Sequence, residues 1–168
     1  MGRAYSRTLA SRAFWRARVL LRDPSHANRG RKAVVLVARY ESGDKLRKVA
    51  RRMVDLMRSD ARVLSATQGL RLTVGFAITD LDETFLLTFR DGEIGGEVGA
   101  DITSAQIRLA MDAETLDGVF AGEVDPMGAA MSGQIMFSGD LGLAMSLLGV
   151  VDDLREIYKA ARDQAEAE

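Results

Sequence analysis

The 168-residue chain contains no cysteine and a single histidine, His26. Without cysteine it can form no disulfide, no zinc–thiolate site and no thiol nucleophile, and one histidine cannot build a multi-histidine metal site. No apolar run approaches the roughly 20 residues that a membrane-spanning helix needs. These absences exclude several classes of enzyme and metalloprotein and favour a reducing, cytoplasmic compartment.

Groups arranged for catalysis are also scarce. His26 precedes the part of the chain that predicts a sheet, so the serines of that part have no histidine base. Residues 80–83 contain three acids, but these lack the spacing of an EF-hand calcium site. The segment instead predicts a polar hairpin turn. The glycines at 95–96 and 139–142 are not followed by Lys-Ser or Lys-Thr, so they predict no phosphate-binding loop. We therefore expect no catalysis, no metal and no cofactor.

Charge divides the chain into a basic arm and an acidic body. Residues 1–32 carry nine Lys/Arg and one acid, a net charge of +8, whereas the remainder carries 14 Lys/Arg and 23 acids, a net charge of −9. The last six residues, 163–168, form a short acidic tail that we expect to be frayed. The predicted organisation is an arm at 1–32, a domain at 33–162 and this tail.

Four interpretations of the arm differ in what it contacts. On a helical wheel three leucines and two alanines of the arm share one side, whereas Tyr5, Trp15 and Val19 fall on the basic side, so the amphipathic character is moderate. In the first, the arm packs on the domain or stays partly disordered. In the second, it lies on an anionic membrane surface. In the third, it serves as a transit peptide. Nucleic-acid binding is disfavoured, because the acidic body would repel phosphate.

Strands are predicted where apolar residues alternate. Residues 70–79 give the clearest alternation, and residues 84–90 repeat it after the turn at 80–83. Asp91-Gly92 predicts a hairpin into a weak strand at 93–99, because both residues tolerate positive φ. Two further strands are expected at 106–111 and 134–138, which makes five.

Helices are predicted around these strands. One helix opens at Gly43-Asp44 and a short one follows Asp60. Asp112 and Asp125 cap two more, which end at glycines, and from Asp140 a single long helix is expected to run to about Arg162. Alternating strands beside amphipathic helices predict an α+β fold, in which helices cover the one apolar face of the sheet.

Several segments, in order and spacing, resemble the sterol carrier protein 2 (SCP2) family of lipid-binding domains. The most specific is 131–145 (MSGQIMFSGDLGLAM), and the others are 72–80 (LTVGFAITD), 89–92 (FRDG), 100–102 (ADI), 107–111 (IRLAM), 115–122 (TLDGVFAG) and 124–126 (VDP). The resemblance covers roughly residues 44–162. It implies one five-stranded, mostly antiparallel sheet, with an apolar tunnel between the sheet and its helices for fatty acids, acyl-CoA or sterols.

The chain departs from the family pattern at two places. Ser132 stands where many members have glutamine, so the tunnel mouth is expected to differ. The chain ends in Glu-Ala-Glu rather than in a peroxisomal targeting tripeptide, which argues against peroxisomes. An excess of arginine over lysine and the stand-alone domain are typical of a bacterial member.

Large and adaptable apolar side chains are the candidate ligand-binding residues. Met127 and Met131 are expected to form one wall, Phe137 a floor on the sheet, and residues 143–147 a lid. On this assignment Phe137→Asp should destroy the fold or the binding, and Met131→Trp should block the ligand. The full set is Phe76, Phe85, Leu87, Phe89, Leu109, Met111, Phe120, Met127, Met131, Phe137, Leu143, Met145 and Leu147.

The resemblance and the missing catalytic groups favour a non-catalytic carrier of a lipid or other apolar small molecule. The alternative is an accessory subunit that docks to a partner enzyme or to a membrane through its basic arm and presents a lipid-like substrate. The arm has a further candidate partner, an acidic face on a second copy of the chain, which would give a homodimer.

Overall fold

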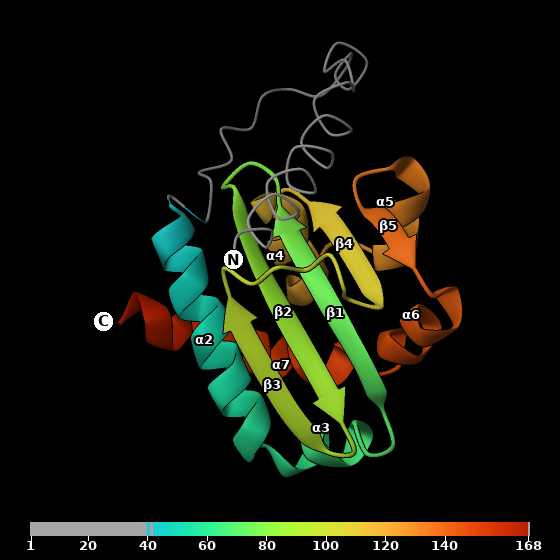
Figure 1. Ribbon diagram of the computed structural model, residues 1–168. Helices are drawn as coiled ribbons and strands as arrows, with labels where there is room; N and C mark the ends of the chain where they lie inside the picture. Colours follow the sequence, from blue (N-terminus) through green and yellow to red (C-terminus); the bar gives the residue numbers. More distant parts are fainter. Residues whose placement is uncertain (1–39, 41, 168) are drawn as a thin grey trace, which may run out of the picture. The chain divides into compact units, whose positions relative to one another are not determined.

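The fold is known from a computed structural model, which describes residues 40 and 42–167 (Figure 1). The predicted basic arm at 1–32, His26 and the apolar run at 33–37 lie outside the described residues. The elements in chain order are α2 (Gly43–Ser59), α3 (Ala61–Ala66), β1 (Arg71–Ile78), β2 (Glu83–Arg90), β3 (Glu93–Val98), β4 (Ile107–Met111), α4 (Ala113–Ala121), α5 (Pro126–Ser132), β5 (Met136–Gly139), α6 (Leu141–Leu148) and α7 (Val151–Glu166).

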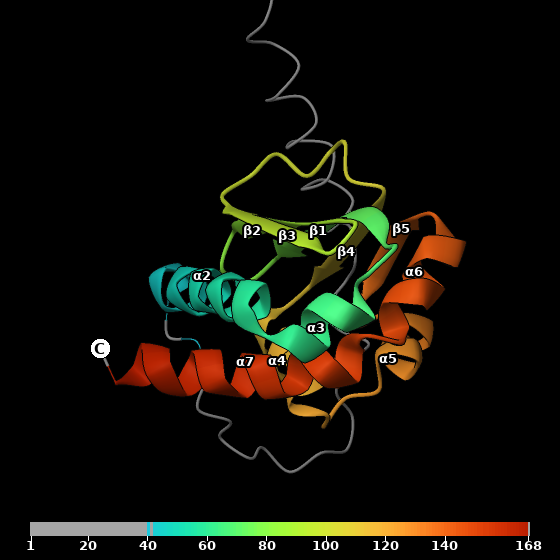
Figure 2. The ribbon, with the colours of Figure 1, turned by 90° about the horizontal axis from the view of Figure 1, so that it is seen from below.

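The five strands form one sheet in the order β3-β2-β1-β4-β5. Neighbouring strands are antiparallel except β1 and β4, which are parallel. Val74, Phe76 and Ile78 of β1 are buried on the inner face, as the alternation predicts. Figure 2 shows α2, α4 and α7 on the same side of the sheet. The expected α+β architecture, one mostly antiparallel five-stranded sheet with helices over one face, is confirmed.

Two connections set the strand order. Asp91 and Gly92 have φ of 52° and 87°, so they form the tight turn predicted between β2 and β3. Residues 99–106 then carry the chain across the outer face of the sheet to β4. A Cβ on Gly75 would meet Cβ of Ile102 at 2.5 Å, so the crossing segment lies directly on β1.

Aspartates begin the helices as the sequence predicts. The side chain of Asp112 accepts a hydrogen bond from the backbone N–H of Thr115 at 2.7 Å, and that of Asp125 accepts from Gly128 at 2.6 Å. Asp140 caps α6 in the same way. These bonds satisfy N–H groups that the first turn of a helix leaves without partners.

The predicted single helix from Asp140 to about Arg162 is wrong. The structure has two helices, α6 and α7, with Gly149 and Val150 between them. Gly149 has the poorest helix propensity of any residue except proline, and Val150 N–H bonds to the carbonyl of Leu147 to close the last turn. The second helix also runs past the expected end, to Glu166, so most of the predicted tail is helical rather than frayed.

Candidate functional site

One cavity of about 210 Å³ lies between the sheet and helices α4 to α7. We call it the apolar cavity, because all 21 residues of its lining are apolar. They are Val74, Phe76, Leu87, Ile107, Leu109, Met111, Leu116, Val119, Phe120, Pro126, Met127, Ala130, Ile135, Phe137, Leu141, Ala144, Met145, Leu147, Leu148, Val151 and Leu154.

Strand periodicity determines which side chains of β4 and β5 form the sheet side of the apolar cavity, its ceiling. Residues two apart on a strand face the same way, so Ile107, Leu109 and Met111 of β4 all line it. Phe137 of β5 pairs with Leu109 across the sheet and extends the same surface. Because none of these side chains carries a polar group, the ceiling offers a ligand only shape and van der Waals contact.

The mouth of the apolar cavity is formed by side chains that are also exposed to solvent. Met127 of α5, Phe137 of β5, and Leu141 and Met145 of α6 line the cavity, yet 37% to 63% of each is exposed. Helix α6 has no buried residue. One face of α6 packs against the core through Leu143, Ala144 and Leu147, while Leu141 and Met145 stay exposed at the opening.

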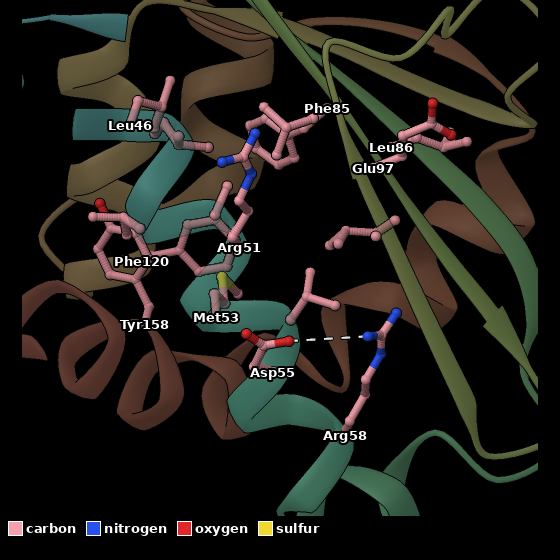
Figure 3. A pocket seen from close by; sticks show the side chains of 17 residues that line it. Leu46, Arg51, Met53, Asp55, Arg58, Phe85, Leu86, Glu97, Phe120 and Tyr158 are labelled. Carbon is pink, nitrogen blue, oxygen red and sulfur yellow. Dashed lines mark ion pairs between the residues drawn. The ribbon is translucent and has the colours of Figure 1, made fainter. Parts of the chain in front are cut away.

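A second cavity, of about 370 Å³, opens between α2 and the neighbouring strands β2 and β3 (Figure 3). We call it the α2 cleft. Its floor is apolar and includes Met53, Phe85 and Phe120, whereas charged side chains stand at its rim: Arg51, Asp55, Arg58 and Glu97. Arg58 Nε donates to the carbonyl of Ile94 on β3 at 2.7 Å, which ties the helix to the strand.

Leu87, Leu116 and Phe120 separate the two cavities, because each of them lines both. Phe120 also stacks on Tyr158, with 5.0 Å between ring centroids. The family resemblance implies one tunnel, whereas the structure has two chambers that share these three side chains as a partition.

Most predicted ligand-binding residues are brought together by the fold. The apolar cavity is lined by nine of the thirteen: Phe76, Leu87, Leu109, Met111, Phe120, Met127, Phe137, Met145 and Leu147. Phe85 lines the α2 cleft instead, while Phe89, Met131 and Leu143 line neither cavity.

The positions of the remaining residues have physical reasons. Met131 is 84% exposed, because the short helix α5 turns Ala129 and Ala130 toward the core and points the next position outward. Phe89 is 1% exposed and packs in the core near the far end of β2. Met131 therefore cannot form the wall that the sequence suggested.

Sequence reasoning missed several lining residues, although a signal was present for them. Val74 and Ile107 lie two positions before predicted residues on their strands, so period-two alternation places them on the same face. On α7, Val151 and Leu154 are three apart and share one helical face. Periodicity therefore identifies wall residues that size and flexibility of the side chain alone do not.

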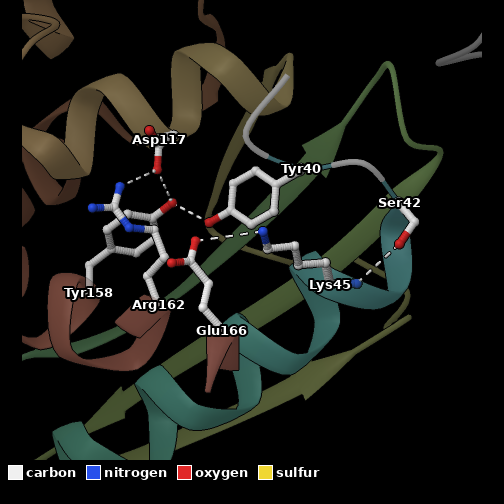
Figure 4. A network of polar contacts seen from close by, with 7 residues as sticks. All are labelled: Tyr40, Ser42, Lys45, Asp117, Tyr158, Arg162 and Glu166. Carbon is white, nitrogen blue, oxygen red and sulfur yellow. Dashed lines mark hydrogen bonds and ion pairs between the residues drawn. The ribbon is translucent and has the colours of Figure 1, made fainter. Parts of the chain in front are cut away.

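A polar network is buried beside the α2 cleft (Figure 4). The hydroxyl of Tyr158 donates to Oδ1 of Asp117 at 2.8 Å, and Arg162 lies 3.2 Å from the same oxygen. The hydroxyls of Tyr40 and Tyr158 also bond to each other. Burial is the main cause that raises the pKa of both phenols, that of Tyr40 to about 12. Both tyrosines are therefore neutral hydrogen-bonding groups at ordinary pH.

Two of the acids at 80–83 connect neighbouring elements of the fold. Asp80 accepts from the backbone N–H of Ala113 at 2.9 Å, and Glu83 pairs with Arg47 of α2. Within the part of the chain that the structure describes, no three acids or histidines cluster closely enough to hold a metal ion. The polar side chains in this region thus connect elements to one another.

Comparisons with known proteins agree on the fold. The sequence profile of the SCP-2 sterol transfer family matches residues 53–152. No curated protein sequence matches the chain. A crystal structure of sterol carrier protein 2 aligns with a TM-score of 0.53 and 16% identity, over 68% of this chain and 93% of that one. A ubiquinone synthesis protein, UbiJ-SCP2, aligns with a TM-score of 0.51 and 14% identity, over 63% and 95%.

A larger protein contains a similar domain. A double mutant of the sec-alkyl sulfatase PisA1 of Pseudomonas sp. aligns with a TM-score of 0.52 and 23% identity over 67% of this chain. The alignment spans only 16% of the sulfatase. At these identities the likenesses show the fold alone. No helix among the described residues is long and apolar enough to cross a membrane.

Proposed function

This chain belongs to the SCP-2 sterol transfer family, and from that membership we propose that it is a non-catalytic carrier of an apolar ligand. The single observation that supports this proposal most strongly is the apolar cavity, whose 21 lining residues include no polar side chain. Such walls favour an alkyl chain or sterol ring over any polar metabolite. Fatty acids, fatty acyl-CoA and sterols are the ligand classes that we propose.

The free energy available from burial is sufficient for a carrier. Each buried methylene contributes about 0.8 kcal/mol, so a dozen contribute roughly 10 kcal/mol before other terms. Association and chain ordering cost about half of that or more. The remainder corresponds to binding in the micromolar range, which holds a ligand and still allows its release.

The absence of a histidine base from residues 27–168 supports a carrier over an enzyme. The sulfatase that shares the fold is an enzyme, but the aligned region is a small part of its length. Its activity is therefore not extended to this chain. Cytoplasmic location stays a prediction from composition.

The test compares two tryptophan substitutions on the same short helix. Met127 lines the apolar cavity at its mouth, whereas Met131 lies outside both cavities. We expect Met127→Trp to weaken the binding of a fluorescent fatty acid about tenfold or more, because the larger ring fills the entrance. Met131→Trp should bind the fatty acid as the wild type does. This expectation replaces the one drawn from the sequence, that Met131→Trp blocks the ligand.

Two results would contradict the carrier proposal. One is a purified protein whose lipid extract is empty and which binds no fluorescent fatty acid at roughly tens of micromolar. The other is equal binding by the wild type and Met127→Trp, which would place the ligand outside the apolar cavity. Mass spectrometry of lipid that co-purifies with the protein would identify the natural ligand.

We propose as a second candidate that the chain is an accessory subunit that presents a lipid-like substrate to a partner enzyme. Its support is the division of charge between residues 1–32 and the rest of the chain. That a ubiquinone synthesis protein has a similar fold is compatible with such a role. Deletion of residues 1–32 should then abolish partner or membrane association and leave fatty acid binding unchanged. If the deletion leaves both unchanged, the accessory role is wrong.

A further inference from the structure

The exposed large apolar side chains of the described residues gather around the mouth of the apolar cavity. Figures 1 and 2 both show α5, β5 and α6 together at one end of the sheet. Four of these side chains line the mouth, and the fifth lies beside it on α5. The exposed fractions are Met127 41%, Met131 84%, Phe137 37%, Leu141 63% and Met145 52%. We call Met127, Phe137, Leu141 and Met145 the mouth patch.

The mouth patch holds four of the five large apolar side chains that are exposed among the described residues, and Met131 is the fifth. Leu143, Ala144 and Leu147 of α6 pack against the core, but no residue of this apolar helix is fully buried. Contiguous exposed apolar surface of this kind marks a place where another molecule binds. The ligand inside the cavity would not cover the outward faces of Leu141 and Met145, which are each more than half exposed.

The charge around the mouth patch selects its occupant. Between Arg108 and Arg155 the chain has no lysine, arginine or histidine. Asp125 and Asp140 begin α5 and α6, the two helices that carry most of the patch. Of the other acids in this interval, Asp117 is buried beside Arg162 and Asp152 pairs with Arg155, so the charge beside the patch comes from Asp125 and Asp140.

Three kinds of occupant differ in how they meet these acids. A second copy docked face to face would bring acid against acid, which is unfavourable. An anionic membrane would be repelled for the same reason. A basic amphipathic protein segment would place apolar side chains on the patch and its cations near Asp125 and Asp140.

We propose that the mouth patch is a docking surface for a basic amphipathic protein segment. The segment would cover the opening of the apolar cavity, so its binding would be coupled to the entry and exit of the ligand. This goes beyond the carrier role, because it gives the mouth a protein partner of defined chemistry. Residues 1–32 of this chain have that composition in sequence, with nine Lys/Arg and one acid, and a peptide of residues 1–32 is the probe.

The experiment titrates the peptide into the full-length protein in a calorimeter. We expect binding in the micromolar range at low salt and clearly weaker binding at high salt, because part of the attraction is electrostatic. The double variant Leu141→Asn/Met145→Gln removes apolar surface without changing charge. It should bind the peptide about tenfold more weakly, a loss of about 1.4 kcal/mol. The control Met131→Gln alters a more exposed methionine outside the mouth and should bind as the wild type does.

Several outcomes would overturn the proposal. A peptide of the same composition in scrambled order that binds equally well would show general charge attraction without recognition of the patch. No measurable binding, either by the full-length protein or by a protein that lacks residues 1–32, would exclude the mouth patch as the docking surface. Equal binding by the double variant would exclude it as well. If the double variant instead loses only self-association or vesicle binding, the occupant is a second copy or a lipid surface. The titration is made without added fatty acid, so the carrier proposal can fail separately.

Discussion

At the scale of single residues, the buried network of Tyr40, Asp117, Tyr158 and Arg162 connects distant parts of the chain. Asp117 of α4 is 3% exposed and accepts from Tyr158 and Arg162 of α7. Because the only hydroxyl proton of Tyr158 goes to Asp117, Tyr40 must donate to the oxygen of Tyr158. The network therefore links the residues just before α2 to α4 and α7.

This network predicts a loss of stability at alkaline pH. Burial raises the pKa of Tyr40 to about 12, whereas a tyrosine in the unfolded chain titrates near 10. The folded state thus favours the neutral phenol, and this contribution is fully present below about pH 10 and lost as the pH rises toward 12. Two pH units correspond to roughly 2–3 kcal/mol. Urea unfolding between about pH 8 and pH 12 measures the change.

The matched control is Tyr158→Phe, which removes one of the two buried phenols. The burial of Tyr158 beside Tyr40 and Asp117 also raises its pKa, so its loss removes part of the pH dependence. We expect this variant to be less stable at neutral pH and to lose stability less steeply above pH 10. A wild-type protein whose stability is flat to about pH 12 would show that neither phenol is protected by burial.

The residues of this network could not be predicted from the sequence. Tyr40 and Tyr158 are 118 positions apart, and Tyr158 and Asp117 are 41 apart. Their contact depends on how α4 and α7 pack, which leaves no local pattern. The aspartate caps were predictable, because a cap acts on N–H groups two or three residues away.

At the scale of elements, the close approach of α2 to the edge strand β3 depends on glycine. A Cβ on Gly96 would overlap Cγ2 of Val54 on α2, and its contact with Cγ1 would be 3.1 Å. Gly95 faces the other side of the strand, where a Cβ would meet Cβ of Thr88 at an ordinary 3.5 Å. The two adjacent glycines thus separate the effect of close packing from the effect of strand propensity.

We expect Gly96→Ala to destabilise the fold and Gly95→Ala to leave it unchanged or slightly more stable. Replacing glycine in a strand gains roughly 0.5–1 kcal/mol of backbone entropy. At Gly96 an overpacking cost of about 1–3 kcal/mol exceeds that gain, because Val54 is β-branched and cannot easily move away. Thermal unfolding of both variants measures the difference. Equal melting temperatures would show that α2 is free to shift away from β3.

Elements were predictable where one periodicity dominates and less so at their ends. The strands appeared from alternation alone, and the short helix α5 appeared from Asp125-Pro126 at its start and Gly133 at its end. The break between α6 and α7 was missed, because Leu147, Leu148, Val150 and Val151 continue an apolar pattern across Gly149. A single glycine is tolerated in many helices, so only packing decides whether one ends there.

At the scale of the whole molecule, the division of the interior into two chambers was not predictable. The resemblance implied one tunnel, and the walls of that tunnel were largely found in one region. Whether side chains from opposite walls meet depends on rotamers and on packing to within a methylene group. Here Leu87, Leu116 and Phe120 close the space between the apolar cavity and the α2 cleft.

Phe120 is the residue of this partition whose replacement should enlarge the ligand space most. It lines both cavities, and its ring stacks on Tyr158, which lines the α2 cleft. Phe120→Leu shortens the partition from the side of α4 and should join the apolar cavity to the α2 cleft. Each additional methylene of the fatty acid that the joined cavity buries contributes about 0.8 kcal/mol to the free energy of binding, or roughly fourfold in affinity. The variant should therefore favour longer fatty acids more than the wild type does.

Phe89→Leu is the matched control, because it removes the same atoms from a buried phenylalanine that lines neither cavity. Both variants should lose about 1–3 kcal/mol of stability as core substitutions, so stability alone does not separate them. Affinities for saturated fatty acids of increasing length do separate them: the preferred length should increase in Phe120→Leu and stay constant in Phe89→Leu. If the two variants keep the same preference, the ligand does not reach the partition and occupies one chamber only.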